Sequence, residues 1–222
     1  MVGDLNVRRR SRQVRIGPRG LPGDLALPAQ SQALVLFAHG SGSSRLSSRN
    51  RWVAEVLQQH RLSTLLFDLL DEAEAADRRK VFDIGLLSER VEQALDWAAG
   101  QTPLASMSLG LFGASTGAAA ALCAAAARPG LVAAVVSRGG RPDLAADRLA
   151  QVQAPTLLIV GGVDLEVLAL NRQALRELRC SKRLEVVPGA SHLFEEPGAL
   201  GCVAQLAAAW FDTHLGRRPQ AA

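Results

Sequence analysis

Residues 108–127 read SLGLFGASTGAAAALCAAAA, and this stretch decides the fold class. Its first half is a short apolar run that predicts a buried strand, and its second half is rich in Ala, the best helix former. Between them lies Gly113-Ala114-Ser115-Thr116-Gly117, a G-x-S-x-G pattern whose small residues allow a strand and a helix to pack closely around one serine. The stretch predicts a tight strand-turn-helix unit that exposes Ser115.

Further apolar runs of strand length lie on both sides of this unit and alternate with segments of helical periodicity. That alternation is typical of an α/β protein with a mostly parallel sheet of about seven or eight strands, helices on both faces and no large lid domain. A Gly/Pro turn at residues 17–20 predicts an antiparallel hairpin that leads into the sheet. The expected strands are residues 13–16, 25–27, 33–38, 62–67, 108–112, 131–137, 156–160 and 183–187.

Composition favours one globular domain, because 222 residues with 48% hydrophobic and 21% charged side chains suffice for a single large core. Three cysteines give no disulfide framework and no zinc-type spacing. No apolar run is long enough to cross a bilayer, and the Arg-rich N-terminus lacks the apolar segment of a signal peptide. These features predict a cytoplasmic protein that does not bind a membrane.

The net charge of +4 is concentrated at the N-terminus, since residues 1–20 contribute +5 and the remainder −1. We therefore expect a basic arm at residues 1–12, a single domain at 13–214 and a short tail at 215–222. The arginines Arg8, Arg9, Arg10 and Arg12 are not interleaved with aromatic residues, and no nucleic-acid-binding motif follows them. A nucleic-acid partner is not expected.

A nucleophilic serine needs a base, and the chain has four histidines. His192 follows the expected strand 183–187, at the sheet edge where open α/β sheets place their sites, so we predict that it is the base. His39 has the wrong position in the chain order and is expected to support its loop by hydrogen bonding. His60 is interpreted as a partly buried structural residue at a helix end, and His214 lies on the last helical turn.

The third catalytic residue should be a carboxylate between Ser115 and His192, because this arrangement orders its triad as serine, acid, histidine. Asp164 follows the expected strand 156–160 and two glycines that let the chain turn, so it is the first choice. Asp143 and Asp147 satisfy the same order but resemble helix-start residues. Glu166 is the nearer rival.

The loop His39-Gly40-Ser41-Gly42 closes strand 33–38, where a glycine-rich loop supplies an oxyanion donor. We expect the amides of Ser41 and Thr116 to form the oxyanion hole. Arg45, Arg49, Asn50 and Arg51 follow this loop and either attract a substrate anion or are solvated residues at a helix start. The residues expected to bind substrate are Gly40, Gly42, Arg45, Asn50 and Phe194. No metal or organic cofactor is expected.

The motifs AHGSGSSRLSSRN (38–50), FGASTGAAAAL (112–122) and PGASHLFEEPGAL (188–200), with the Gly161–Asp164 loop, resemble the dienelactone hydrolase-like branch of the α/β-hydrolase superfamily over residues 13–212. The resemblance implies an ester-cleaving triad of Ser115, Asp164 and His192. Dienelactone hydrolases proper use a cysteine nucleophile, so the serine here favours a general carboxylesterase. Similar sequences also occur as the hydrolase half of fusions with phosphoribosyltransferase domains, although no phosphoribosyl-diphosphate site is recognised here.

The sequence therefore predicts a serine carboxylester hydrolase that cleaves small, short-acyl esters through an acyl-enzyme, as a monomer or homodimer. Segments 68–80 and 138–153 are too short for a full lid, which favours an open, shallow site. Two alternatives stay open: thioester or lactone hydrolysis by the same triad, and a non-catalytic binding module on the same fold.

Overall fold

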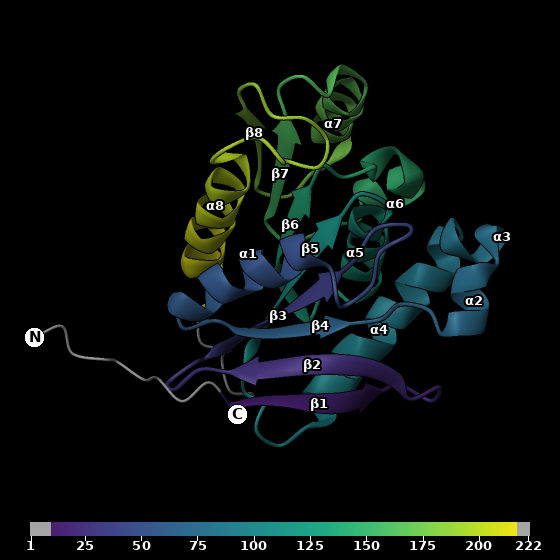
Figure 1. The fold of residues 1–222 in the computed structure, drawn as a ribbon, viewed down its shortest axis with the longest axis vertical. Coiled ribbons are helices and arrows are strands. Elements are labelled where there is room, and N and C mark those ends of the chain that lie inside the picture. Colours follow the sequence, from purple (N-terminus) through teal and green to yellow (C-terminus); the bar gives the residue numbers. More distant parts are fainter. Residues whose placement is uncertain (1–9, 217–222) are drawn as a thin grey trace, which may run out of the picture.

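A computed structural model describes residues 10–216 (Figure 1). One sheet of eight strands has the order β1-β2-β4-β3-β5-β6-β7-β8. The pairs β1–β2 and β2–β4 are antiparallel, and every other neighbouring pair is parallel. The strands are β1 (Arg10–Ile16), β2 (Leu21–Leu27), β3 (Ala33–Ala38), β4 (Ser63–Phe67), β5 (Ser108–Ala114), β6 (Val132–Arg138), β7 (Thr156–Gly161) and β8 (Lys182–Val187).

Helices cover both faces of this sheet (Figure 1). One face packs on α1 (Ser48–Gln59) and α8 (Ala199–His214), whose apolar residues share a core cluster with Phe37 and Phe112. The opposite face packs on α4 (Ile84–Gly100), α5 (Thr116–Ala127) and α7 (Leu165–Glu177). The short helices are α2 (Glu72–Ala76), α3 (Arg78–Val81), α6 (Ala146–Leu149) and the 3₁₀ helix η1 (Pro142–Ala145).

Two-sided burial explains the continuous apolar strands. Along β3, Leu34 and Leu36 belong to the core under α4 and α5, whereas Val35 and Phe37 belong to the core under α1 and α8. Successive strand residues point to opposite faces, so a strand covered on both sides must be apolar at every position. All residues of β3 and β5 are buried, which fixes the central strand of the nucleophile in a rigid layer.

The boundaries differ from the sequence-based expectations mainly at the chain ends. β1 begins at Arg10, so residues 10–12 of the expected basic arm pair with Leu25–Leu27 of β2. Ladder hydrogen bonds come from the backbone, so polar residues on an edge strand do not end it. At the other end, Leu215 of the expected tail is 7% exposed and packs in the core cluster under α1 and α8. Arg8, Arg9 and residues 217–222 lie outside the described residues.

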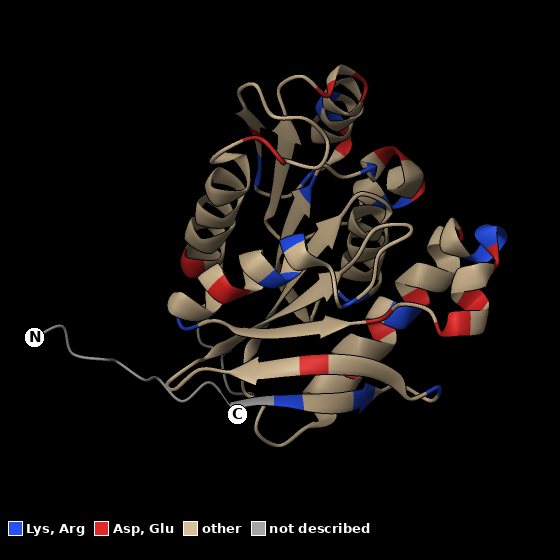
Figure 2. Cartoon of the chain, in the orientation of Figure 1, with Lys and Arg blue, Asp and Glu red and all other residues tan. Residues whose placement is uncertain are grey.

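Charges of both signs are mixed over α2 and α3 (Figure 2). Two short helices form here, because Asp71 and Asp77 cap their N-termini by accepting from Glu74 N and Arg79 N. Within residues 10–216, no helix is both long enough and apolar enough to cross a membrane.

Candidate active site

Ser115 occupies the turn between β5 and α5 with φ 52° and ψ −123°, in the left-handed region that costs a non-glycine residue about 1–3 kcal/mol. The neighbouring glycines permit this turn. A Cβ on Gly117 would lie 2.3 Å from the carbonyl oxygen of Ala38, and one on Gly113 would lie 2.4 Å from Cα of Ala118. The G-x-S-x-G pattern therefore holds strand, helix and the oxyanion loop in close contact around one strained serine.

Backbone hydrogen bonds fix this turn to the end of β6. The amide of Ser115 donates to the carbonyl oxygen of Arg138 at 3.2 Å, and the carbonyl oxygen of Ser115 accepts from Arg141 N at 3.1 Å. Because β5 and β6 are parallel neighbours, their carboxyl ends meet at the same sheet edge. Ser115 is therefore held at that edge.

His192 and Asp164 meet at the same edge, with 2.7 Å between His192 Nδ1 and Asp164 Oδ2. Asp164 starts α7 but makes no side-chain capping bond, and its side chain is 15% exposed. An ionised carboxylate only accepts hydrogen bonds, so this contact assigns the ring proton to Nδ1 and leaves the lone pair of Nε2 available as a base.

Close packing of two loops brings this pair together. A Cβ on Gly161 would lie 2.3 Å from Ala190 O, and Val163 N donates to Ala190 O at 3.1 Å. The loop after β7, which carries Asp164, thus lies directly on the loop after β8, which carries His192. A side chain at position 161 would force the two loops apart.

The Arg138–Gly139 segment connects the pair to the serine. Gly139 has φ 50°, and a Cβ there would lie 3.5 Å from His192 Nδ1, while Arg138 O accepts from Ser115 N. The structure thus brings the predicted nucleophile, base and acid to one edge. The hydrogen bond between Ser115 Oγ and His192 Nε2, and the three catalytic roles, stay predictions.

The rival residues have other partners or places. Asp143 binds the guanidinium of Arg141 through both carboxylate oxygens, at 2.9 and 2.8 Å. Asp147 and Glu166 lie in the first turns of α6 and α7. His60 was expected to be partly buried, but it is exposed at the end of α1, where its ring contacts Asp212 Oδ2 at 2.9 Å. His214 stacks on Trp210, with 4.3 Å between ring centroids.

His39 supports the oxyanion loop, as the sequence predicted. Its Nε2 accepts from Leu69 N at 3.1 Å, so the ring proton is on Nδ1 and is donated to Gly40 O at 3.0 Å. Burial lowers the pKa of His39. Because C=O and N–H point in opposite directions in a trans peptide, the bond to Gly40 O also sets the direction of the Ser41 amide.

The Ser41 amide donates to the hydroxyl oxygen of Thr116 at 2.9 Å. The sequence did not indicate this contact, since it predicted the two backbone amides of these residues as donors. Gly40 lies against the predicted nucleophile, because a Cβ there would lie 3.0 Å from Cβ of Ser115. An oxyanion at this position must share the Ser41 amide with Thr116 or replace the hydroxyl.

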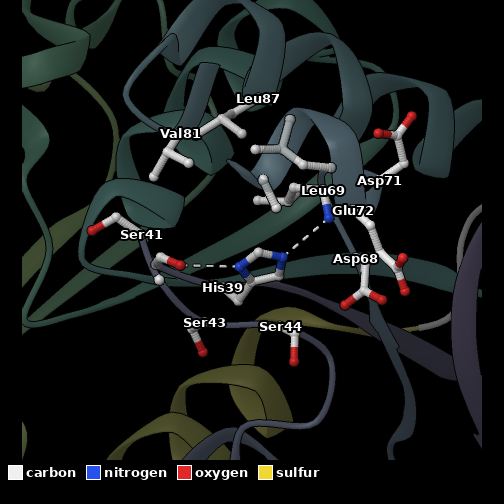
Figure 3. Close-up of a pocket in the computed structure, with 14 residues that line it drawn as sticks. His39, Ser41, Ser43, Ser44, Asp68, Leu69, Asp71, Glu72, Val81 and Leu87 are labelled. Carbon is white, nitrogen blue, oxygen red and sulfur yellow. Dashed lines mark hydrogen bonds between the residues drawn. The ribbon is translucent and has the colours of Figure 1, made fainter. Parts of the chain in front are cut away.

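A cavity of about 320 Å³ opens beside this loop and reaches α2, α3 and α4 (Figure 3). Its apolar lining comes from Leu69, Leu70, Ala75, Val81 and Leu87. Asp68, Asp71 and Glu72 lie together at one side of it (Figure 3). The cavity shares residues 39–42 with the expected oxyanion loop. Ser115 and His192 do not line it, and Gly40, which lies against Ser115, connects the cavity to the predicted nucleophile.

The residues expected to bind substrate divide into two groups. Gly40 and Gly42 line the cavity. Arg45 does not offer a free charge, because its Nη1 lies 2.7 Å from Asp68 Oδ2 and its amide donates to Asp68 Oδ1 at 2.7 Å. Asn50 is 3% exposed on the buried face of α1, and Phe194 is 1% exposed within the core. Both side chains are covered in this structure, and their contact with substrate stays a prediction.

The two other arginines after the oxyanion loop are also paired, so neither is a simply solvated helix-start residue. Arg51 lies 3.2 Å from Asp24 Oδ2, and Arg49 lies 3.1 Å from Glu195 Oε1.

Sequence reasoning missed Arg138, the last residue of β6. It is 7% exposed, and its Nε and Nη1 are buried without a hydrogen-bond partner among the described residues. Burial first, and then the positive charge of Arg49, lowers the pKa of Arg138 to about 10. A charged residue at the carboxyl end of an otherwise apolar strand was the available signal.

Within residues 10–216, no group of three or more His, Cys, Asp or Glu residues is placed to hold a metal ion. The donor groups at this edge are the serine, imidazole and carboxylate already described, with amides of the oxyanion loop. The arrangement suits acyl transfer by a nucleophile, a base and hydrogen-bond donors.

The strand order, the turn at Ser115 and the edge that gathers the three residues define the α/β-hydrolase fold. Within it, the chain belongs to the dienelactone hydrolase family, whose profile matches residues 58–213. A dienelactone hydrolase from Anabaena variabilis is 55% identical, with a TM-score of 0.90 and coverage of 94% of this chain and 99% of that one. Est1E from Butyrivibrio proteoclasticus shares the fold, with a TM-score of 0.76 at 14% identity over 90% of this chain and 98% of its own.

Two proteins of Mycobacterium tuberculosis, from strains CDC 1551 and H37Rv, are also 55% identical over 203 residues. Their names assign them provisionally to the phosphoribosyl transferases. The alignment covers 91% of this chain but 46% of theirs, so the chain spans about half the length of these relatives.

Proposed function

We propose that this protein is a serine carboxylester hydrolase that cleaves small, short-acyl esters through an acyl-enzyme. The observation that carries the proposal is the 2.7 Å contact between Asp164 and His192 at the sheet edge that also holds the strained Ser115. Membership of a hydrolase family supports the same reaction class. The phosphoribosyl transferase name belongs to proteins of which this chain matches 46%, so we do not assign that activity here.

In the proposed reaction, Ser115 Oγ attacks the ester carbonyl while His192 Nε2 takes the hydroxyl proton. Asp164 stabilises the imidazolium, and the amides of Thr116 and Ser41 stabilise the oxyanion. His192 then gives the proton to the leaving alcohol, and water attacks the acyl-enzyme by the same route. Each oxyanion donor contributes about 3 kcal/mol of transition-state stabilisation in enzymes of this type.

The cavity beside the oxyanion loop supports a preference for short acyl groups. Its volume of about 320 Å³ is at the lower end of the range for small-molecule sites. The 68–81 segment contributes two short helices to its wall and no lid domain. Acetyl to butyryl esters are therefore the first substrates to test.

The test compares 4-nitrophenyl esters from acetyl to long-chain acyl in the wild type, Ser115→Ala and Asp164→Asn. We expect kcat to fall by about 10⁴-fold or more in Ser115→Ala and by up to about 10⁴-fold in Asp164→Asn. Ser106→Ala, which changes an exposed serine in the connection before β5, is the matched control. Wild-type turnover by Ser115→Ala would remove the proposed nucleophile.

A covalent readout separates the alternatives. A fluorophosphonate should label Ser115 at one equivalent per chain, as found by mass spectrometry. Labelling with turnover of thioesters or lactones but not of nitrophenyl esters would favour the alternative hydrolase activities. Absence of both labelling and turnover in a folded wild type would favour a non-catalytic module.

A further inference from the structure

Arg138 is a buried charge without a partner at the edge where Ser115 lies. Its residue is 7% exposed, and its Nε and Nη1 make no hydrogen bond within the described part of the chain. The guanidinium lies over the Phe194 ring, 5.9 Å from its centroid. A cation–π contact offsets only part of the loss of hydration, so this charge is under-satisfied.

A second guanidinium lies close by. Arg49, in the first turn of α1, is near enough for its charge to act on Arg138, and its own Nε is also buried without a partner. The partner of Arg49 is Glu195, at 3.1 Å, and the Glu195 side chain is 63% exposed. Two positive charges thus act on each other at this edge, and the carboxylate that pairs with one of them is exposed.

The position of this pair is fixed relative to the predicted nucleophile. Arg138 O accepts from Ser115 N, and Gly139 lies against His192. Along β6, Ala134 and Val136 belong to the core under α1 and α8, so Arg138, two residues further on, points to this same face. The Asp68–Leu87 cavity lies on the side of β4 and α4. Arg138 at the end of β6 therefore lies on the other side of β5 from that cavity.

We propose that Arg138 and Arg49 form an anion subsite that binds a carboxylate or phosphate carried by the ester substrate. The inference rests on the proposed function, because it specifies which esters that site accepts. A bound anion supplies acceptor oxygens for the buried Nε and Nη1 of Arg138 and for the buried Nε of Arg49, and arginine suits carboxylate and phosphate equally through paired hydrogen bonds. Glu195 holds Arg49 through an exposed ion pair of little strength, so an incoming anion displaces it.

The first experiment uses two acetyl esters that differ only in the charge of the alcohol part, 4-acetoxybenzoate and methyl 4-acetoxybenzoate, because the acyl group is assigned to the cavity on the other side of Ser115. The measured quantity is the ratio of kcat/KM for the charged ester to that for the neutral one. We expect this ratio to fall by about tenfold to hundredfold in Arg138→Met, because hydrogen bonds between charged groups are lost. Arg49→Gln should lower it in the same direction, and Arg138→Lys should restore part of it.

Arg51→Gln is the matched control, since Arg51 is on the same helix but is paired with Asp24. Its ratio should equal that of the wild type. A ratio that is unchanged in both Arg138→Met and Arg49→Gln overturns the proposal. An equal fall in Arg51→Gln also overturns it, because net charge would then explain the effect.

A second experiment measures binding without turnover. 4-Hydroxybenzoate and inorganic phosphate are titrated into Ser115→Ala by calorimetry and by thermal unfolding, since a bound anion stabilises the folded state. We expect binding that disappears in the Ser115→Ala/Arg138→Met double variant, and the tighter anion identifies the substrate group. No binding of either anion overturns the subsite. Arg138-dependent binding alongside wild-type turnover by Ser115→Ala would support the subsite while refuting the proposed nucleophile.

Discussion

Arg90 and Arg138 are both buried arginines, but they differ in their partners. The Arg90 side chain on α4 is 7% exposed, lies 3.2 Å from Glu74 Oε1 and donates to Gln93. Arg138 at the end of β6 is equally buried, with the Phe194 ring below its guanidinium and a second cation beside it. Arg90 joins α4 to Glu74 on α2, whereas Arg138 lies at the sheet edge that holds Ser115.

The difference separates a buried charge that stabilises the fold from one that does not. Burying a guanidinium without a counter-ion is unfavourable, and a carboxylate partner with good geometry offsets much of that cost. Glu74 gives Arg90 this partner and also lies within 4 Å of Arg19 and Lys80. Arg138 has no carboxylate partner within the described residues, so the free-energy cost of burying its charge is not offset. Buried groups that lack partners concentrate at functional sites. The unpaired charge of Arg138 is for this reason assigned to the proposed anion subsite.

The largest effect is expected for Glu74→Ala, which removes the partner of Arg90 and one half of the capping box with Asp71. Leaving a buried charge uncompensated should lower the free energy of unfolding by about 3–5 kcal/mol. Equilibrium unfolding in urea measures this change in the free energy of unfolding. Glu72→Ala, on the exposed side of the same helix, should change little. A loss below about 1 kcal/mol would mean that Glu74 does not stabilise Arg90.

Arg138→Met should act in the opposite direction. Removing an unpaired buried charge while keeping an apolar side chain should leave the free energy of unfolding unchanged or raise it, by up to about 2 kcal/mol. The same urea titration tests it. A loss as large as that of Glu74→Ala would show that Arg138 has a structural partner and would end the contrast between the two arginines.

The pH dependence sharpens this test. The pKa of Arg138 is lowered to about 10 in the folded protein, well below the ordinary value of an arginine in the unfolded chain. Between these values the unfolded chain binds more protons, so the stability of the wild type gains from this residue as pH rises. Below pH 10 the Arg138 side chain is charged in the folded protein, so the full free-energy cost of burying that charge is present. The advantage of Arg138→Met over the wild type should therefore be constant below pH 9 and shrink as pH rises above 10.

A smaller effect is expected at His39, which joins the oxyanion loop to Leu69 on the cavity side. Burial lowers the pKa of His39, so the unfolded chain binds the proton first as pH falls below about 6.5. The wild type should lose stability on going from pH 7.5 to 5.5. His39→Asn should lose less over the same interval, because other titrating groups contribute equally to both proteins. Equal losses would exclude a buried neutral imidazole.

Local patterns were sufficient to predict the framework. The continuous apolar run of β3 and the Gly-x-Ser-x-Gly turn after β5 are properties of neighbouring residues, so they are visible without coordinates. The same holds for the order of Ser115, Asp164 and His192 along the chain. These features place the expected site residues at one edge of the sheet.

The charge pairing could not be predicted in this way. Asp68 and Arg45 are 23 residues apart, and Arg49 and Glu195 are 146 apart, so no local pattern links them. The hydroxyl of Thr116 binds the Ser41 amide across 75 residues, which changes how the oxyanion loop is held. Burial of Arg138 likewise depends on the helix and loop that cover the end of β6. Contacts of this kind depend on the tertiary structure.

The smallest effect concerns the cavity side, where Ala75 on α2 lines the space near Leu87. Ala75→Leu adds three carbon atoms at an exposed position, so it narrows the cavity without disturbing the core. The ratio of kcat/KM for butyryl over acetyl 4-nitrophenyl ester should fall about fourfold, the value of roughly one buried CH₂ group. Arg138→Met should leave this ratio as in the wild type, because sites with no shared partners act independently. If Ala75→Leu changed the preference for the charged acetoxybenzoate and Arg138→Met changed the acyl preference, the acyl group and the anion would bind in one place. The assignment of the two groups to opposite sides of Ser115 would then be wrong.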